Sequence, residues 1–170
     1  MHARTLLITG FVALAALLSA SPKSETSTDA TAAFARLKTL VGEWEANTPD
    51  GKSHLTYELT AGGSVLVERE TADEMPEMIT MFHLDGSRLI LTHYCMAGNQ
   101  PRMQARAFQP ETGEIRFQFL DATNLVSPGA GHMHNATYRI VDHDHVESQW
   151  QFYENGAPKM TESAQYTRVR

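Results

Sequence analysis

The only cysteine of the chain lies two positions after a histidine, at Cys95 and His93. Residues two positions apart on a β-strand lie on the same face, so these two side chains would be neighbours. A thiolate beside an imidazole can act as a nucleophilic pair, which would make the protein an enzyme. The alternative is a buried cysteine that packs as a small apolar side chain beside a hydrogen-bonded histidine. Because no acidic orienting residue or oxyanion motif accompanies the pair, the sequence favours this second interpretation.

Two further histidines, His132 and His134, have the spacing of two metal ligands on one face of a strand. Two imidazoles in this arrangement can bind zinc or copper, and the addition of His93 and Cys95 would give a soft site suited to Cu(I). The alternative is a polar loop edge with solvated histidines. The segment 143–145 also carries two histidines, but its expected hairpin turn lies at the opposite end of the fold, so it is excluded from this site.

The segment from His93 to Met103 combines polar, aromatic and sulfur-containing side chains that could orient a small hydrophobic or amphipathic ligand. An inward Arg102 could bind a ligand carboxylate with two hydrogen bonds. Met103 and the alanines that alternate after it resemble the inward set, however, which would turn Arg102 outward. The candidate ligand-binding residues are His93, Tyr94, Cys95, Asn99, Arg102, Met103 and His134. We expect no resident cofactor, with copper or zinc as the alternative.

The composition indicates one compact domain and argues against nucleic-acid partners. The chain has 170 residues, 42% of them hydrophobic and 20% charged, which is enough apolar material for one core. The formal net charge of −6 leaves no basic surface to meet phosphates, which argues against nucleic-acid binding. A single cysteine excludes an intrachain disulfide framework.

The first residues of the chain are typical of a secretory signal. A run of 13 mostly apolar residues covers 6–18, which is shorter than the about 20 residues of a membrane-spanning helix. We expect a signal peptide over 1–20 with cleavage near Ala20, a flexible tether over 21–29, and a periplasmic or secreted domain over 30–170. An uncleaved N-terminal anchor is the alternative, and no transmembrane span is expected after the signal is removed.

The elements that would position these residues are one helix and a series of antiparallel strands. Apolar residues at helical spacing predict a helix over 30–41. After it, period-two alternation is interrupted by Gly62-Gly63, Asp85-Gly86, Thr112-Gly113 and Asn155-Gly156, which are signals of tight turns. The expected strands cover 43–48, 53–60, 65–72, 78–84, 88–96, 102–109, 114–121, 134–142, 146–154 and 159–169.

Ten consecutive antiparallel strands leave two exposed edges unless the sheet closes on itself. The sequence therefore predicts an all-β protein, an up-and-down antiparallel barrel with one N-terminal helix, and a two-sheet sandwich is the alternative. The longer connections, near 73–77, 97–101 and 122–133, all fall at one end of such a barrel. Because loops on a rigid scaffold commonly carry binding groups, we expect the functional site at this end.

The segment Gly42-Glu43-Trp44 at the start of the first strand resembles the Gly-x-Trp signature of lipocalin-like (calycin) barrels. In that superfamily the tryptophan stacks under an arginine of the last strand, a role for which Arg168 is available. Over residues 34–169 the chain is also similar to an uncharacterised family of bacterial secreted lipocalin-like domains, mainly through the segment 91–103. The resemblance implies a barrel with a cavity and leaves the ligand open.

The strand number also resembles that of fatty-acid-binding and nitrobindin-like barrels. Nitrobindin-like barrels bind haem through a histidine late in the chain, whereas this sequence has no histidine after His145. This departure argues against haem. The leading hypothesis is thus a barrel that binds a small apolar or amphipathic molecule in its interior, with a soft-metal site and a His93–Cys95 enzyme as alternatives.

Overall fold

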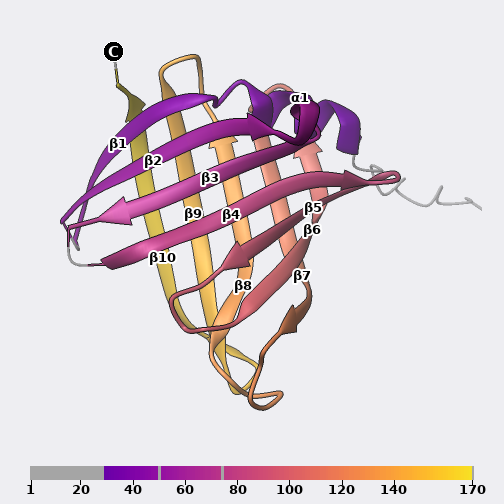
Figure 1. Ribbon diagram of the computed structural model, residues 1–170, viewed down its shortest axis with the longest axis vertical. Coiled ribbons are helices and arrows are strands. Elements are labelled where there is room, and N and C mark those ends of the chain that lie inside the picture. The colour runs from indigo at the N-terminus through magenta and orange to yellow at the C-terminus, as the bar shows by residue number, and fades with distance from the viewer. Residues whose placement is uncertain (1–28, 50, 74, 170) are drawn as a thin grey trace, which may run out of the picture.

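The computed structural model describes residues 29–49, 51–73 and 75–169, and these form a closed antiparallel barrel of ten strands with one N-terminal helix (Figure 1). The expected signal peptide and most of the tether lie outside the described residues. The helix α1 spans Ala30–Lys38. The strands are β1 Gly42–Thr48, β2 Gly51–Thr60, β3 Val65–Ala72, β4 Met75–Asp85, β5 Arg88–Tyr94, β6 Gln100–Gln109, β7 Glu114–Thr123, β8 His132–Ile140, β9 His145–Glu154 and β10 Ala157–Arg168.

Closure is achieved by pairing between the first and last strands. Every strand pairs with its sequence neighbour in antiparallel fashion, and β1 also pairs with β10 through Trp44 opposite Arg168 and Glu45 opposite Thr167. No edge strand is left among the ten strands that the structure describes, which is the physical reason that short antiparallel strands adopt this arrangement. The predicted up-and-down barrel is confirmed, and the alternative of a two-sheet sandwich is wrong.

The helix α1 covers one end of the barrel (Figure 1). Its first turn is capped by the Asp29 side chain, which accepts a hydrogen bond of 2.9 Å from the backbone N–H of Ala32. Phe34 and Leu37 are buried against the core. The helix ends at Lys38, three residues before the predicted end, because the backbone then tightens: the N–H of Leu40 bonds to the carbonyl of Leu37 three residues back.

Several strands are longer than the sequence predicts, and the loops are correspondingly shorter. The strand predicted at 78–84 spans Met75–Asp85 and is longer at both ends, whereas the one predicted at 134–142 spans His132–Ile140 and begins and ends two residues earlier. Cross-strand pairing explains the extension of β4, since Ala72 of β3 lies opposite Met75 of β4. Strand pairing therefore reaches further into the loop-rich end of the barrel than the sequence predicts.

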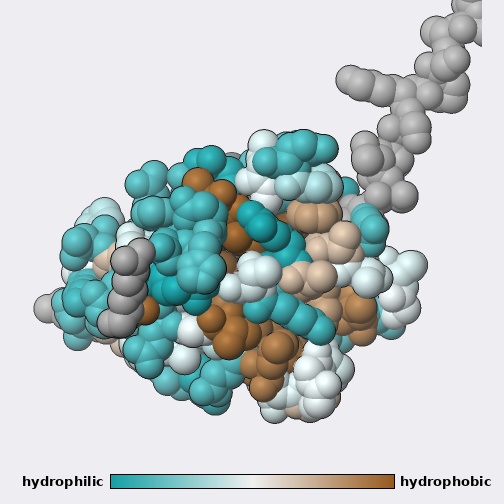
Figure 2. Space-filling model, turned by 90° about the horizontal axis from the view of Figure 1, so that it is seen from above, coloured by the Kyte–Doolittle hydropathy of each residue, from teal (hydrophilic) through white to brown (hydrophobic). Residues whose placement is uncertain are grey.

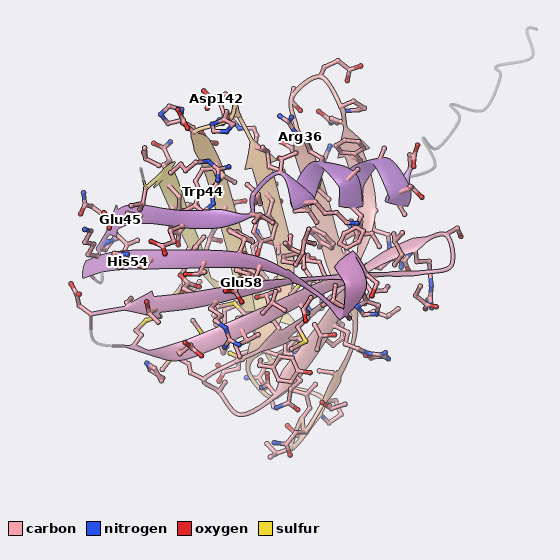
Figure 3. The ribbon with its side chains drawn as sticks, turned by 45° about the horizontal axis from the view of Figure 1, so that its top comes forward. Arg36, Trp44, Glu45, His54, Glu58 and Asp142 are labelled. Carbon is pink, nitrogen blue, oxygen red and sulfur yellow. The ribbon has the colours of Figure 1, made fainter. Side chains whose placement is uncertain are left out.

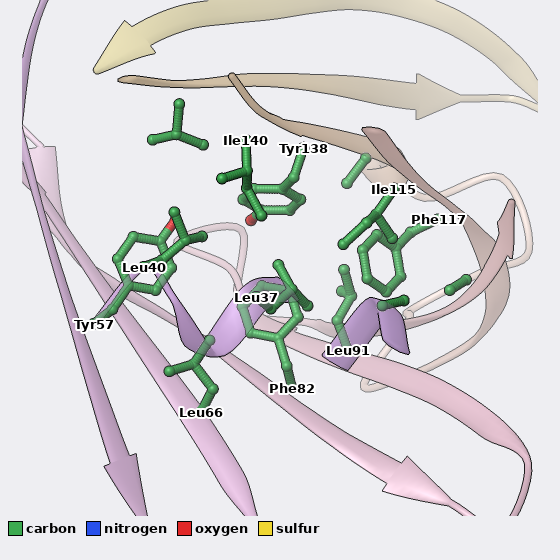
Figure 4. Packing of buried hydrophobic residues seen from close by; sticks show 14 of the residues in the cluster. Leu37, Leu40, Tyr57, Leu66, Phe82, Leu91, Ile115, Phe117, Tyr138 and Ile140 are labelled. Carbon is green, nitrogen blue, oxygen red and sulfur yellow. The ribbon is translucent and has the colours of Figure 1, made fainter. Parts of the chain in front are cut away.

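The core occupies the part of the interior next to the helix (Figure 4). Leu37 and Leu40 from the helical end meet large side chains from strands around the barrel. The rings of Phe82 and Tyr138 meet edge to face with centroids 5.5 Å apart, and Phe117 lies 5.9 Å from Phe82. The interior therefore holds a continuous apolar cluster on this side, to which strands from the whole circumference contribute.

The outer wall carries most of the charged side chains. Lys52 of β2 forms an ion pair of 2.6 Å with Glu45 of β1, and His54 lies 3.4 Å from the same carboxylate (Figure 3). Seen from above, hydrophilic and hydrophobic side chains alternate in patches over the surface (Figure 2). Within the described part of the chain, no helix has the length and apolar character that crossing a membrane requires.

Candidate functional site

A cavity of about 260 Å³ opens into the barrel at the end opposite to the helix. Its rim includes Thr48 and Pro49, which end β1, and Ala72 and Met75, which flank the turn between β3 and β4. The walls come from β2 to β5 on one side and from β8 to β10 on the other. The cavity thus lies at the loop-rich end, where the sequence predicts the functional site.

A buried carboxyl group, Glu68, lies at the inner part of this cavity with only 3% of its surface exposed. The hydroxyl of Tyr57 donates a hydrogen bond of 2.6 Å to its Oε2, and the hydroxyl of Tyr138 donates one of 3.2 Å to its Oε1. Burial raises the pKa of Glu68 to about 7, and the hydrogen bonds from the hydroxyls oppose part of that rise. Near neutral pH this group therefore exists in both protonation states.

A second carboxyl group, Glu70, follows on the same face of β3. Its Oε1 accepts hydrogen bonds of 3.2 Å from both Ser53 and Tyr166, whose hydroxyls lie 3.1 Å apart. Burial raises the pKa of Glu70, and these two hydroxyls lower it in part. Two acidic side chains thus lie in one wall of the cavity, each held by neutral hydroxyl groups.

His93 faces the same cavity from β5 and is 3% exposed. Its Nδ1 lies 3.0 Å from the hydroxyl of Thr80, and its ring lies 4.9 Å from that of Trp150. Burial lowers the pKa of His93 to about 4, so the ring is neutral at physiological pH. The buried Nε2 has no hydrogen-bond partner among the described residues, which is costly for a polar atom in the interior.

The barrel register connects these groups. Glu68 of β3 lies directly opposite Thr80 of β4, and Thr80 lies directly opposite His93 of β5. The Thr80 hydroxyl also acts to lower the pKa of Glu68, against the larger rise that burial causes. A continuous polar row therefore crosses three strands within an otherwise apolar interior.

The remaining lining of the cavity is largely apolar. Among the described lining residues there is no lysine and no arginine, whereas a third acid, Glu162, is present. The apolar lining includes four methionines and a tryptophan, which are Met75, Met78, Met133, Met160 and Trp150. Methionine is adaptable in shape and suits a cavity that accepts an apolar molecule.

The structure places the predicted His93–Cys95 pair differently from a nucleophilic dyad. No hydrogen bond joins the two side chains among the described residues, and the Cys95 sulfur instead accepts one of 3.5 Å from the N–H of Ala97. Burial raises the pKa of Cys95, which disfavours the thiolate that catalysis would need. Neighbouring Tyr94 is 44% exposed and does not line the cavity, so its placement corrects the expectation that it would orient a ligand there.

Three further candidates also lie outside the cavity lining. Arg102 is exposed and forms an ion pair with Asp121 on the outer wall, which corrects its expected role in ligand binding. Met103 is fully buried in the apolar cluster, so it faces inward as predicted but lies in the core. Asn99 is buried, and its side-chain nitrogen donates a hydrogen bond of 2.9 Å to the carbonyl of Gly131, tying two loops together.

His132 and His134 contact each other but do not join His93 and Cys95. Their Nε2 and Nδ1 atoms lie 3.0 Å apart, and His134 is stacked between the rings of Phe119 and Tyr153 at 4.7 and 4.1 Å. Neither histidine lines the cavity. Among the described residues no three histidine, cysteine, aspartate or glutamate side chains are grouped as a metal ion would require. The predicted four-residue metal site is therefore not assembled in this structure.

The structure contains the Trp–Arg contact that the lipocalin-like resemblance implies. The guanidinium of Arg168 lies over the Trp44 ring at 4.1 Å, and a side chain at Gly42 would meet Arg168 Nη1 at 2.8 Å. This contact lies at the helical end, away from the cavity. His93 is the one histidine among the described residues that line the cavity, and it belongs to β5.

Sequence reasoning missed Glu68 and Glu70, because the apolar pattern of their strand favours the opposite face as the inward one. In the strand 65–72 the residues at 66, 68, 70 and 72 lie on the inward face, and the alternation places two glutamates there. The opposite face, with Val65 and Val67, is the more apolar one by composition alone. Apolar composition therefore predicts the wrong inward face for this strand, and only the closed barrel shows which face lies inside.

Comparisons with known proteins identify the fold and nothing narrower. The chain matches no family model and no curated protein. It is similar to the crystal structure of Rv2717c from M. tuberculosis, with 16% identity, a TM-score of 0.54, and coverage of 81% of this chain and 98% of that one.

A second solved structure, a DUF3598-family protein of unknown function from Nostoc punctiforme, has 15% identity and a TM-score of 0.53. That match covers 78% of this chain and 48% of the other. At these identities the likeness establishes a shared barrel fold, and the neighbour of unknown function assigns no activity to it. The chain therefore has the fold of these barrels, and its chemistry has to be argued from its own cavity.

Proposed function

We propose that this protein binds a small amphipathic molecule inside the barrel. The observation that carries the proposal is the cavity of about 260 Å³, whose wall combines methionine and tryptophan surface with the buried polar groups of Glu68, Glu70 and His93. Internal cavities of about 150 Å³ already accept a benzene ring, so this one is large enough for a one- or two-ring molecule. Apolar contact would supply affinity, and the polar row would supply orientation.

The unsatisfied Nε2 of His93 supports this proposal. A buried polar atom without a partner costs free energy, and a ligand that forms a hydrogen bond with it would recover that cost. Of the sequence candidates, His93 is the one that keeps a ligand-contacting position. Glu68, Glu70, Trp150 and Tyr166 join it as residues that the fold contributes.

We further propose that the chain is a lipocalin-like (calycin) barrel that acts in the periplasm or outside the cell. The Trp44–Arg168 contact and the closed ten-strand barrel support the first part. The apolar run at 6–18 supports the second, since its length is typical of a signal peptide.

Native mass spectrometry of the protein purified from its own source would test the binding function. The expected result is an organic mass excess that disappears on denaturation. In the variant Ala72→Phe, which places a ring at the rim of the cavity, the excess should fall at least tenfold in occupancy. The matched control is Ala157→Phe at an exposed position of β10, which should keep it. A bare mass in the wild type, together with no uptake of any small aromatic probe, would contradict the proposal.

A further inference from the structure

We propose that the ligand of this cavity is an organic cation, a small aromatic or apolar molecule with a protonated amine. This inference rests on the proposed binding function and narrows the class of molecule. It separates the protein from barrels that hold fatty acids, because those ligands carry the opposite charge and need a basic side chain in the cavity.

The balance of charge in the cavity lining favours a cationic ligand. Three acids, Glu68, Glu70 and Glu162, line the cavity, and no lysine or arginine does so among the described lining residues. A carboxylate or phosphate ligand entering here would be repelled by these acids and would lose its hydration without gaining a counter-ion. A cationic ligand would gain a counter-ion.

The two inner acids have hydrogen-bond partners that carry no charge. Glu68 is held by the hydroxyls of Tyr57 and Tyr138, and Glu70 by those of Ser53 and Tyr166. These donors are neutral, so they satisfy hydrogen bonds without neutralising charge. Both bonds to Glu70 fall on its Oε1. An ammonium group bound beside Glu70 would supply the missing positive charge.

A further feature of the wall is the unpartnered nitrogen of His93. The Nδ1 atom lies 3.0 Å from the Thr80 hydroxyl, whose oxygen can accept a hydrogen bond from it, whereas the buried Nε2 has no partner among the described residues. A neutral imidazole carries one proton, and when that proton is on Nδ1 the Nε2 atom is a bare acceptor. An acceptor in the wall calls for a donor on the ligand, and an ammonium N–H is such a donor.

The aromatic surface of the cavity also favours a cation. The indole of Trp150 and the rings of Tyr138 and Tyr166 line the cavity, and aromatic faces attract cations. The methionines beside them suit an apolar body. The cavity thus offers negative charge, an acceptor and aromatic faces to one part of a ligand and flexible apolar surface to the rest.

Three probes of nearly equal shape and different charge would test the inference: 2-phenylethylamine, 2-phenylethanol and 3-phenylpropanoate. Each is titrated into the full-length mature protein by isothermal calorimetry at pH 8. At this pH Glu68, whose pKa is about 7, is mostly ionised, and the amine, with a pKa of about 10, is protonated. We expect the amine to bind at least tenfold more tightly than the alcohol, and the carboxylate to bind more weakly than both.

The variant Glu70→Gln should reduce the preference for the amine over the alcohol at least fivefold while leaving affinity for the alcohol within a factor of two. The amide keeps an oxygen acceptor for Ser53 and Tyr166, so the fold should persist. The matched control is Glu58→Gln, which removes the same charge from an exposed position on the neighbouring strand β2 and should leave the preference unchanged.

The outcomes separate the two proposals. Equal binding of the three probes, or tighter binding of the carboxylate, would overturn the cationic ligand and leave the binding function standing. Loss of preference in Glu58→Gln as well as in Glu70→Gln would also overturn it, since the effect would then be a general one of net charge. Binding of none of the three probes would contradict the binding function itself.

Discussion

The two ends of the barrel interior are built from the same strands and yet differ in nearly every property. The end beneath the helix is filled with apolar side chains such as Phe82, Phe117 and Leu91 (Figure 4). The opposite end is hollow and carries buried acids and a buried histidine. Strand geometry alone makes no such distinction, because it alternates inward and outward residues in the same way along the whole length.

The change from an apolar core to a polar cavity lining takes place within single strands. Along the inward face of β3, Leu66 belongs to the core, whereas Glu68 and Glu70 line the cavity. Tyr138 of β8 lies at the boundary: its ring packs against Phe82 and its hydroxyl donates to Glu68. The comparison indicates that the filled end provides stability, and that this stability allows the other end to keep polar groups that weaken folding.

The largest expected effect is in the filled end. Phe82→Ala removes a fully buried ring in contact with two other rings, and we expect a loss of about 3–5 kcal/mol in the free energy of unfolding. Met160→Ala, at a half-exposed position of the cavity lining, should cost about 0.5 kcal/mol. Urea denaturation followed by circular dichroism measures both. Equal losses would show that the hollow end is packed as tightly as the filled one.

The next largest effect is in the hollow end and depends on pH. A carboxyl whose pKa is raised from 4.5 to about 7 binds more protons in the folded state, so its contribution to stability falls as pH rises through this interval. His93, with its pKa lowered from 6.5 to about 4, does the reverse between those values. In the wild type the two contributions oppose each other between pH 4.5 and 6.5, since each shift amounts to about 3 kcal/mol.

The variant Glu68→Gln removes one of these contributions, so its stability should rise from pH 4 to pH 6.5 through His93, by less than about 3 kcal/mol because Glu70, whose pKa is also raised, opposes part of the rise. The variant His93→Gln leaves the carboxyls alone, and its stability should fall by about 3 kcal/mol from pH 4.5 to pH 7. Urea midpoints across this range measure both slopes. Parallel pH profiles for the two variants would show that these groups are not buried as the structure places them.

The same contrast explains what could be predicted from the sequence. Period-two alternation and the turn signals specified ten strands and closure, because both are local patterns with a fixed geometric consequence. Antiparallel order predicted the end of the barrel at which the cavity lies, and strand alternation placed His93 on the same face as Leu89 and Leu91. Glu68 and Glu70 could not be found in this way, since two of their partners, Tyr138 and Tyr166, come from strands distant in sequence and meet them only across the closed barrel.

The errors also have physical causes. Tyr94 and Arg102 were expected at the site because they lie near the predicted loop, but strand alternation turns Tyr94 away from the face of His93, and Asp121 pairs with Arg102 outside. His132 and His134 were expected to join His93 from a neighbouring part of the mouth. A β-bulge between Met133 and Asn135 changes the register there, and Met133 is the residue of that segment that lines the cavity.

The smallest expected effect concerns the contact that closes the filled end. Arg168 donates hydrogen bonds of 2.8–2.9 Å to the carbonyls of Thr39, Val41 and His143 while it covers the ring of Trp44. Lysine keeps the charge but cannot reach three carbonyls in one plane, so Arg168→Lys should cost about 1–2 kcal/mol of stability. The control Arg116→Lys, in an exposed ion pair with Glu114, should change stability by less than about 0.5 kcal/mol.

This last variant also tests whether the two ends are independent. Arg168 belongs to the helical end and does not line the cavity, so Arg168→Lys should leave the affinity for 2-phenylethylamine within a factor of two of the wild type. Calorimetric titration measures that affinity beside the urea midpoint. A tenfold loss of affinity with unchanged stability would mean that the β1–β10 closure at Trp44 and Arg168 controls the width of the cavity. In that case the filled end would influence ligand binding directly, in addition to stabilising the fold.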